Sequence, residues 1–202
     1  VQAQEGPGLD MDEEGYYLLN SAADVEAYSA WVNLGGDALL SKAKLTADID
    51  YTGITHDPIG KTESLKFNGV FDGQNHRVKN MVIDMPNNDY QGFFGTIRGG
   101  TIIRNLIIDK SCSVTGKNFV GGIAGMAQTT AGNVLIENCV NEATVVATNG
   151  SASGFIGAGK SAYAPLVFLN CLNTGNITGK NATAFCSWNN KGGSSLTNCL
   201  NM

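Results

Sequence analysis

The densest group of chemically capable side chains in this 202-residue chain is Asp72-Gly73-Gln74-Asn75-His76. A carboxylate close to an imidazole could form a general acid/base pair. Asp-Gly and Asn are also typical of tight turns, and strand-like apolar residues flank the group on both sides. We therefore predict a turn here and assign no catalytic residue.

Carboxylates could also do hydrolytic chemistry, because cleavage of a glycosidic bond commonly uses two carboxyl groups about 5–9.5 Å apart. After Asp109 the only acidic residues are Glu137 and Glu142. The sequence does not show any two carboxylates facing one groove. An enzyme that processes polysaccharide is therefore the alternative, and the main expectation is a protein without enzymatic activity. The candidates for such a pair are Asp48, Asp50, Asp84 and Asp109.

The sequence gives little support for a metal site or a reactive thiol. Asp10-x-Asp12-x-Glu14-Gly15 is similar to the start of a calcium loop, but the twelfth position is Ser21 where a bidentate Glu is needed. The five cysteines are odd in number and lack CxxC spacing. A nucleophilic cysteine needs a nearby histidine, and His56 and His76 both lie early in the chain. We expect no metal and no cofactor.

The composition argues against two classes of partner. Charged residues make up 15% of the chain and the net charge is −5, so a basic face for nucleic acid is not expected. No apolar run approaches the roughly 18 residues that span a membrane. The first residues, 1–5, have neither a basic nor an apolar region, so we expect a signal peptide to be absent from this chain.

A repeated motif dominates the rest of the sequence and indicates a repeat architecture. Copies begin at positions 91, 121, 153 and 183, as Gln-Gly-Phe-Phe-Gly, Gly-Gly-Ile-Ala-Gly, Ser-Gly-Phe-Ile-Gly and Thr-Ala-Phe-Cys-Ser, and an earlier, shorter copy begins at Gly69. Each unit has room for about three short strands separated by Gly, Asn or Asp turns, and none for a helix. We predict an all-β fold, a right-handed single-stranded parallel β-helix of about five to six coils. A β-propeller is the second choice, because its blades need ~40–45 residues and these repeat units are too short for that.

Three regions are expected along the chain. Residues 1–15 are predicted to be a flexible acidic segment and residues 43–202 to be the β-helix. Residues 16–42 should form an N-terminal cap of one strand and one helix. Val25, Tyr28 and Val32 lie on one face of that helix, interrupted by Ser29. A cap is needed because the first coil of a solenoid is otherwise an open sheet edge.

In a stack of coils, equivalent residues form columns. The first expected column consists of amides that bond from coil to coil. The second begins with Met81 and Leu106 and continues with three cysteines, which we predict to be buried free thiols. The two columns are Asn80, Asn105, Asn138, Asn170 and Asn198, and then Met81, Leu106, Cys139, Cys171 and Cys199.

These repeats resemble a known family. The segment from Phe71 to Asn80, the two glycine motifs that begin at Gly92 and Gly121, and Ile136-x-Asn138-Cys139-x-Asn141 are similar to GLUG-type repeats. The resemblance covers about residues 16–202, although the last copy lacks the glycines. It implies a secreted or cell-surface bacterial protein, adhesin-like and outer-membrane associated, of the kind found in gut Bacteroidetes. It implies no catalytic motif.

The residues leave three functions open. The first is a surface module that binds an extracellular glycan or protein through a loop edge of the solenoid. Aromatic faces beside amides suit sugars and peptides, although the same aromatics could simply pack against neighbouring loops. The others are the polysaccharide-processing enzyme and a purely structural spacer. The candidate ligand-binding residues are Tyr163, Trp188, Asn189 and Lys191.

The last repeat indicates where a partner could lie. Asn198-Cys199-Leu200-Asn201 is followed only by Met202, whereas the two earlier instances continue into another strand. We expect the open edge of this coil to be covered by an adjoining domain, by self-association or by loop residues.

Overall fold

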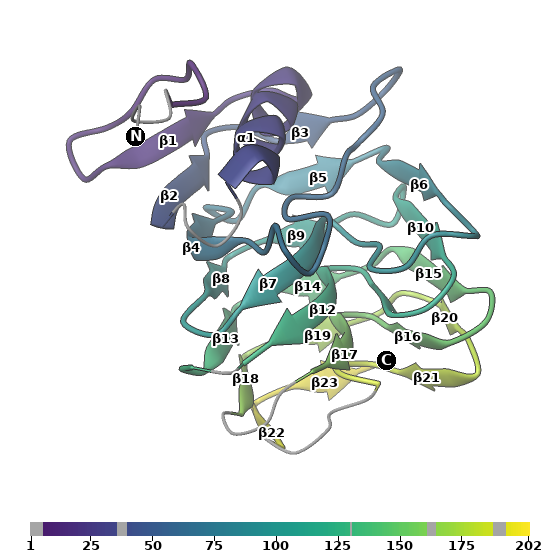
Figure 1. Cartoon of the computed structure of the whole chain (residues 1–202). Helices are drawn as coiled ribbons and strands as arrows, with labels where there is room; N and C mark the ends of the chain where they lie inside the picture. Colours follow the sequence, from purple (N-terminus) through teal and green to yellow (C-terminus); the bar gives the residue numbers. More distant parts are fainter. Residues whose placement is uncertain (1–5, 36–39, 130, 161–164, 188–192) are drawn as a thin grey trace.

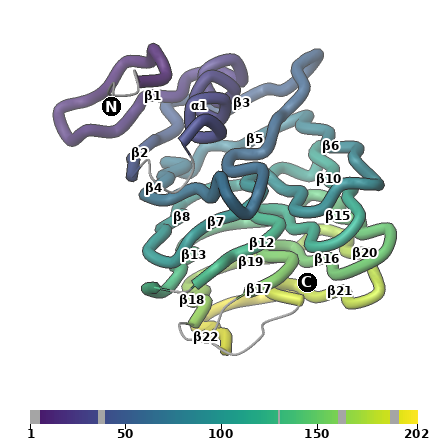
Figure 2. Tube along the Cα trace, in the orientation of Figure 1, coloured from purple at the N-terminus to yellow at the C-terminus, as the bar shows by residue number. Residues whose placement is uncertain are grey.

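The computed structural model describes residues 6–35, 40–129, 131–160, 165–187 and 193–202. These residues form a parallel β-solenoid of about five coils with one helix at its N-terminal end (Figure 1). The tube in Figure 2 shows the coils stacking in chain order, from the purple N-terminal segment to the yellow C-terminal coil. The fold class is the one predicted from the repeat.

Two long sheets run the length of the stack. One has seven strands, ordered β1 Tyr16–Leu19, β2 Leu40–Leu45, β4 Asn68–Asp72, β8 Ile102–Arg104, β13 Val134–Glu137, β18 Leu166–Leu169 and β22 Ser194–Thr197. The other has six, ordered β3 Ile49–Asp50, β5 Arg77–Lys79, β9 Ile107–Ile108, β14 Val140–Asn141, β19 Leu172–Asn173 and β23 Leu200–Asn201.

Three shorter sheets complete each coil. The four-stranded sheet contains β6 Val82–Asp84, β10 Ser113–Gly116, β15 Thr144–Ala147 and β20 Ile177–Thr178. The two three-stranded sheets contain β11 Val120–Gly121, β16 Ser151–Ser153 and β21 Asn181–Thr183, and then β7 Phe94–Arg98, β12 Ala124–Gln128 and β17 Ile156–Gly159. A full coil therefore has five strand segments and not three, because left-handed residues such as Asn105 (φ 54°) and Phe119 (φ 58°) bend the chain between them.

The core is a column of side chains stacked in register along the inside of the coils. Phe71 pairs with Ile103, Ile103 with Ile136, and Ile136 with Phe168. All four are fully buried. The column ends at Leu196, which pairs with Phe168 and is 49% exposed. Repetition of inward apolar residues at one register thus gives a continuous core.

Helix α1 (Ala22–Gly35) covers the first coil, as expected for a cap. It begins after Ser21, whose Oγ accepts a hydrogen bond from the Asp24 amide at 3.2 Å. Tyr28 packs against Phe67 in the core. Ser29 is fully buried within the apolar face, and its hydroxyl donates to the Asp57 carbonyl at 2.6 Å, so it attaches the helix to a loop.

The two ends of the described chain differ in how they contact the rest of the protein. Met11 forms an antiparallel bridge with Tyr17, and Asp12 lies 2.5 Å from the Lys44 ammonium. Backbone and ionic contacts thus hold residues 10–12. The expectation of a flexible segment over residues 1–15 stays a prediction, and residues 1–5 lie outside the described part. At the other end Leu200 is 55% exposed. The expectation of a partner there remains a prediction.

Candidate functional site

The loop residues predicted to bind a ligand, Tyr163, Trp188, Asn189 and Lys191, lie outside the described residues. Their role therefore stays a prediction.

The outer amide column is a coil-to-coil ladder. The Asn138 Nδ2 donates to Asn105 Oδ1 at 3.3 Å, Asn170 donates to Asn138 at 3.1 Å, and Asn198 donates to Asn170 at 3.1 Å. Each of these residues has φ between 52° and 54°. Asn tolerates the left-handed conformation that the corner requires, and its side chain can bond to the next coil.

Asn80 does not belong to this column, contrary to the sequence prediction. Arg77 pairs with Ile107, which places Asn75 opposite Asn105. Asn80 lies one corner later, where its backbone amide donates to Ser111 Oγ at 2.9 Å and its side chain donates to Asp50 Oδ1 at 2.9 Å. The error arose because similar Asn-led segments occupy different corners in neighbouring coils. The same shift places Met81 opposite Cys112, outside the cysteine column.

A second, buried amide ladder was not predicted. Asn141 Nδ2 donates to Asn173 Oδ1 at 2.9 Å, and Asn173 donates to Asn201 at 2.8 Å. Asn141 is fully buried, and a Cβ on Gly122 would lie 2.2 Å from its Oδ1. The corresponding Cβ on Gly154 would lie 2.1 Å from Asn173 Oδ1. The repeated Asn-Cys-x-Asn spacing was the available signal, and the ladder explains the second glycine of the motif.

Two of the three cysteines of the column, Cys139 and Cys171, are buried as predicted, whereas Cys199 is only partly buried because it lies in the exposed last coil. Cys139, Cys171 and Cys199 are free, and each Sγ donates to backbone carbonyls, such as Cys139 to Glu137 O at 3.2 Å. Burial raises the pKa of Cys139, and it raises the pKa of Cys171 to about 12. A thiol that stays protonated is a poor nucleophile.

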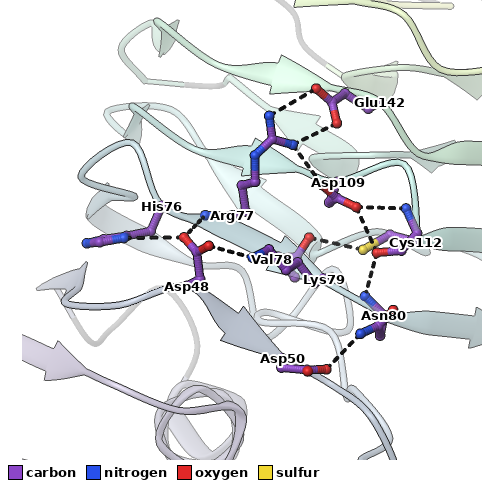
Figure 3. A network of polar contacts seen from close by, with 11 residues as sticks. Asp48, Asp50, His76, Arg77, Val78, Lys79, Asn80, Asp109, Cys112 and Glu142 are labelled. Carbon is purple, nitrogen blue, oxygen red and sulfur yellow. Dashed lines mark hydrogen bonds and ion pairs between the residues drawn. The ribbon is translucent and has the colours of Figure 1, made fainter.

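Three of the four candidate carboxylates, Asp48, Asp50 and Asp109, lie in a network of polar contacts on the outer side of β5 and the neighbouring coils (Figure 3), whereas Asp84 is exposed at the end of β6. Arg77 Nη1 lies 2.7 Å from Asp109 Oδ2 and 2.8 Å from Glu142 Oε2. Lys79 Nζ lies 2.6 Å from Asp48 Oδ2. Arg77 and Lys79 point outward because they alternate with the buried Val78. Cations of one coil therefore bind carboxylates of its neighbours.

This network holds Asp48, Asp50 and Asp109 in the ionised form. The hydrogen bond from Lys79 lowers the pKa of Asp48 to about 2, and the one from Asn80 lowers the pKa of Asp50 to about 2. Burial alone would raise the pKa of Asp109, but hydrogen bonds from Ser111 and Arg77 outweigh it, so this pKa is also lowered. A hydrolase needs one carboxyl with a raised pKa as proton donor, and the pKa of each of these three carboxyls is lowered.

Asp72 and His76, the first candidates in the sequence, act separately. Asp72 Oδ1 accepts the Gln74 amide and the Asn105 side chain, both at 2.9 Å. Its other oxygen lies 2.7 Å from Arg104 Nε. His76 faces Asp48 at 3.4 Å in the charged network. The group is a turn, as predicted, with its carboxylate bound to the next coil.

A buried polar cluster fixes α1 to the loop that follows β3. His56 Nδ1 lies 2.6 Å from Glu26 Oε1, and its Nε2 lies 2.8 Å from the Phe93 carbonyl. Tyr51 OH donates to Glu26 Oε1 at 2.9 Å. The His56 ring also stacks on Phe93, with centroids 5.1 Å apart. This cluster holds the loop against the first coil.

Beside this cluster lies a pocket of about 280 Å³, here called the loop pocket. It is formed between loop residues 55–62 and the corner at residues 85–91. Its apolar lining is Pro58 and the half-exposed Met85. Nothing in the sequence indicated it, because the two segments are about 30 residues apart and carry no shared motif. Its polar lining includes Thr62, Asn88, Asp89 and Gln91.

Comparisons with known proteins support the fold. No family model matches the sequence, so the GLUG resemblance remains a prediction. The crystal structure described as "a putative immunoglobulin A1 protease from Bacteroides ovatus" matches with a TM-score of 0.59 at 19% identity, covering 98% of this chain and 77% of that one. At this identity the match shows a shared fold.

Two relatives are similar in sequence over part of the chain. Halomucin of Haloquadratum walsbyi is 31% identical over 132 residues, or 60% of this chain and 1% of halomucin. A "Putative Gly-rich membrane protein" of Evansella cellulosilytica is 28% identical over 133 residues, or 64% of this chain and 15% of that protein. The chain thus spans a small fraction of both relatives. Among the described residues, no helix has the length and apolar character needed to cross a membrane.

Proposed function

We propose that this chain is a non-enzymatic repeat module of a larger secreted or cell-surface protein, and that it binds a glycan or a protein through its lateral surface. The observation that carries this proposal is the state of the candidate reactive groups. Asp48 and Asp109 are ionised in ion pairs, and Cys139 is a buried protonated thiol. These groups join coils and are not arranged to attack a substrate.

The comparisons support a secreted or cell-surface location. The fold is shared with a Bacteroides protein described as a protease, and the sequence relatives are a halomucin and a protein named for the membrane, both far longer than the matched region. A rigid β-solenoid suits such proteins, because its stacked coils present an extended surface.

A glycan array combined with a pull-down from extracellular protein tests the proposal. We expect a specific hit in one of the two assays. Trp188→Ala should weaken a hit that uses the predicted loop patch. If both assays are blank while the chain is folded, the module is a spacer. Release of reducing ends from any polysaccharide by the chain would favour the enzyme.

A further inference from the structure

We infer that the loop pocket, defined above between residues 55–62 and 85–91, binds the terminal unit of a neutral glycan. This inference rests on the proposed binding function and adds a place and a ligand class. Four features carry it: the size of the pocket, its rigid walls, its mixture of polar and apolar groups, and its charge.

The pocket is small and has both kinds of surface that a sugar ring needs. A volume of about 280 Å³ suits a single ring better than a long chain. The half-exposed Met85 and the small exposed edge of the buried Pro58 supply an apolar wall for the C–H face of a ring. The exposed Asn88 amide and the Thr62 hydroxyl supply hydrogen-bonding groups at the rim.

The walls are fixed before any ligand arrives. On one side, Asn33 Oδ1 accepts the backbone amides of Gly60 and Lys61, both at 3.0 Å. Thr96 Oγ1 donates to the Gly60 carbonyl at 2.7 Å. His56, fully buried, forms the floor through its bonds to Glu26 and Phe93. A preformed loop loses little entropy when it binds.

The opposite wall is fixed as well. Asn118 Nδ2 donates to Asp89 Oδ1 at 2.9 Å, and Gln91 Nε2 donates to the Asp89 carbonyl at 2.7 Å. The turn that carries Asn88 is closed by its backbone bond to the Met85 carbonyl at 2.9 Å. Next to Asp89, Tyr90 stacks on Phe119 with centroids 5.7 Å apart, and both have left-handed φ.

The charge of the pocket selects against acidic ligands. Lys61 and Asp57 form an ion pair with each other at 3.0 Å. Asp89 adds a further negative group, bound to the neutral amide of Asn118. His56 is paired with the Glu26 carboxylate behind it, so this pair adds no net charge, and the remaining one Lys and two Asp of the lining give −1. Uronic and sialic acids would meet a like charge, so a neutral pyranose is the class that fits.

Saturation-transfer NMR on the whole chain tests this inference with a defined panel of sugars. The neutral probes are methyl α-mannoside, methyl β-glucoside, methyl β-galactoside and N-acetylglucosamine, and the acidic probes are galacturonic and N-acetylneuraminic acids. We expect transfer to at least one neutral probe, with weaker transfer to the acidic ones. Asn88→Ala should raise the Kd about tenfold, the effect of one lost hydrogen bond.

Asn87→Ala is the matched control, because Asn87 is exposed, adjacent to Asn88 and not part of the lining. Met85→Ala is a second variant that removes the apolar wall and should also raise the Kd. The side chains of Asn88 and Met85 are both exposed, so neither substitution should unfold the protein. Circular dichroism of each variant checks this.

Three results would overturn the inference. They are no transfer to any neutral probe, stronger binding of the acidic probes, and a Kd that neither Asn88→Ala nor Met85→Ala changes. If one of these appears while the array or pull-down gives a hit, the proposed function stands and only this site falls. If all the assays are blank, both fall together.

Discussion

Asn141 and Asn173 form a buried hydrogen bond of 2.9 Å between successive coils, with almost no contact with solvent. Asn141 Nδ2 also donates to the Ala143 carbonyl at 3.3 Å, so both of its amide hydrogens meet acceptors. Such a bond in a low-dielectric core fixes the register of the stack, because a slip would leave the buried Nδ2 donors without acceptors.

The first prediction concerns a variant that replaces the side-chain amide donor of Asn141. In Asn141→Asp, a carboxylate oxygen would replace Nδ2 and face Asn173 Oδ1 and the Ala143 carbonyl, which are acceptors. We expect a loss of about 3 kcal/mol or more of unfolding free energy at pH 7, the cost of an unpaired buried charge. Urea denaturation measures this loss.

The pH response follows from the same burial. Burial raises the pKa of a carboxyl above its unfolded value of about 3.9. The variant should therefore be most stable below that value and lose stability as pH rises through its folded pKa. Asn138→Asp, in the exposed ladder, is the control and should cost under about 1 kcal/mol. Equal costs for the two variants would contradict the role of the buried ladder.

Much of the fold was predictable because the repeat fixes the register. Asn105, Asn138, Asn170 and Asn198 precede strands at equal positions in successive coils, and stacking brings their amides together. The sequence prediction placed Asn80 in the wrong column because the residues after it are similar to those after Asn105. In the structure Asn80 lies one corner further along its coil. Local similarity cannot show which corner a residue occupies.

The loop pocket could not be predicted from the repeat. Pro58 and Met85 meet only because one loop folds back over the first coil, and neither belongs to the repeat. The anchors of that loop, Glu26 and Asn33, lie on α1. Side chains that come from three non-repeating segments leave no periodic signal in the sequence.

The second prediction concerns the motif glycine that lies beside the ladder. A Cβ in Gly122→Ala would lie 2.2 Å from Asn141 Oδ1 and 2.4 Å from the Gly154 carbonyl, and the latter is backbone that cannot move freely. We expect a loss of several kcal/mol, or failure to fold. Gly53→Ala is the control, since its surroundings are open and only its φ of 75° is unfavourable, at about 1 kcal/mol. Thermal unfolding compares the two, and similar melting temperatures would refute the steric account.

The third prediction concerns the attachment of the cap. Burial alone would raise the Glu26 pKa, but the hydrogen bond and charge of His56 outweigh it, so this pKa lies below its ordinary value of 4.5. A lowered pKa gives stability that is present above 4.5 and lost as pH falls through the folded value. Glu26→Gln should therefore cost about 1–3 kcal/mol at pH 7 and less at pH 3.

Urea melts of the wild type and Glu26→Gln at the two pH values measure this difference. Glu13→Gln, which alters an exposed carboxylate, serves as the control and should have little effect at either pH. A cost for Glu26→Gln that is the same at pH 3 and pH 7 would show that the carboxylate charge is not what holds the loop.

The last prediction ranks the cysteines by reactivity. Alkylation by iodoacetamide needs a thiolate that the reagent can reach. Cys139 is fully buried with a raised pKa, and Cys171 is 1% exposed with a pKa of about 12, whereas Cys199 is partly exposed near the edge of the stack. Among the three cysteines of the column, mass spectrometry of the native protein at pH 8 should find Cys199 modified first and Cys139 last. The same reaction in urea should modify all three at similar rates. Early modification of Cys139 in the native protein would mean that the column opens, and with it the core that the repeat builds.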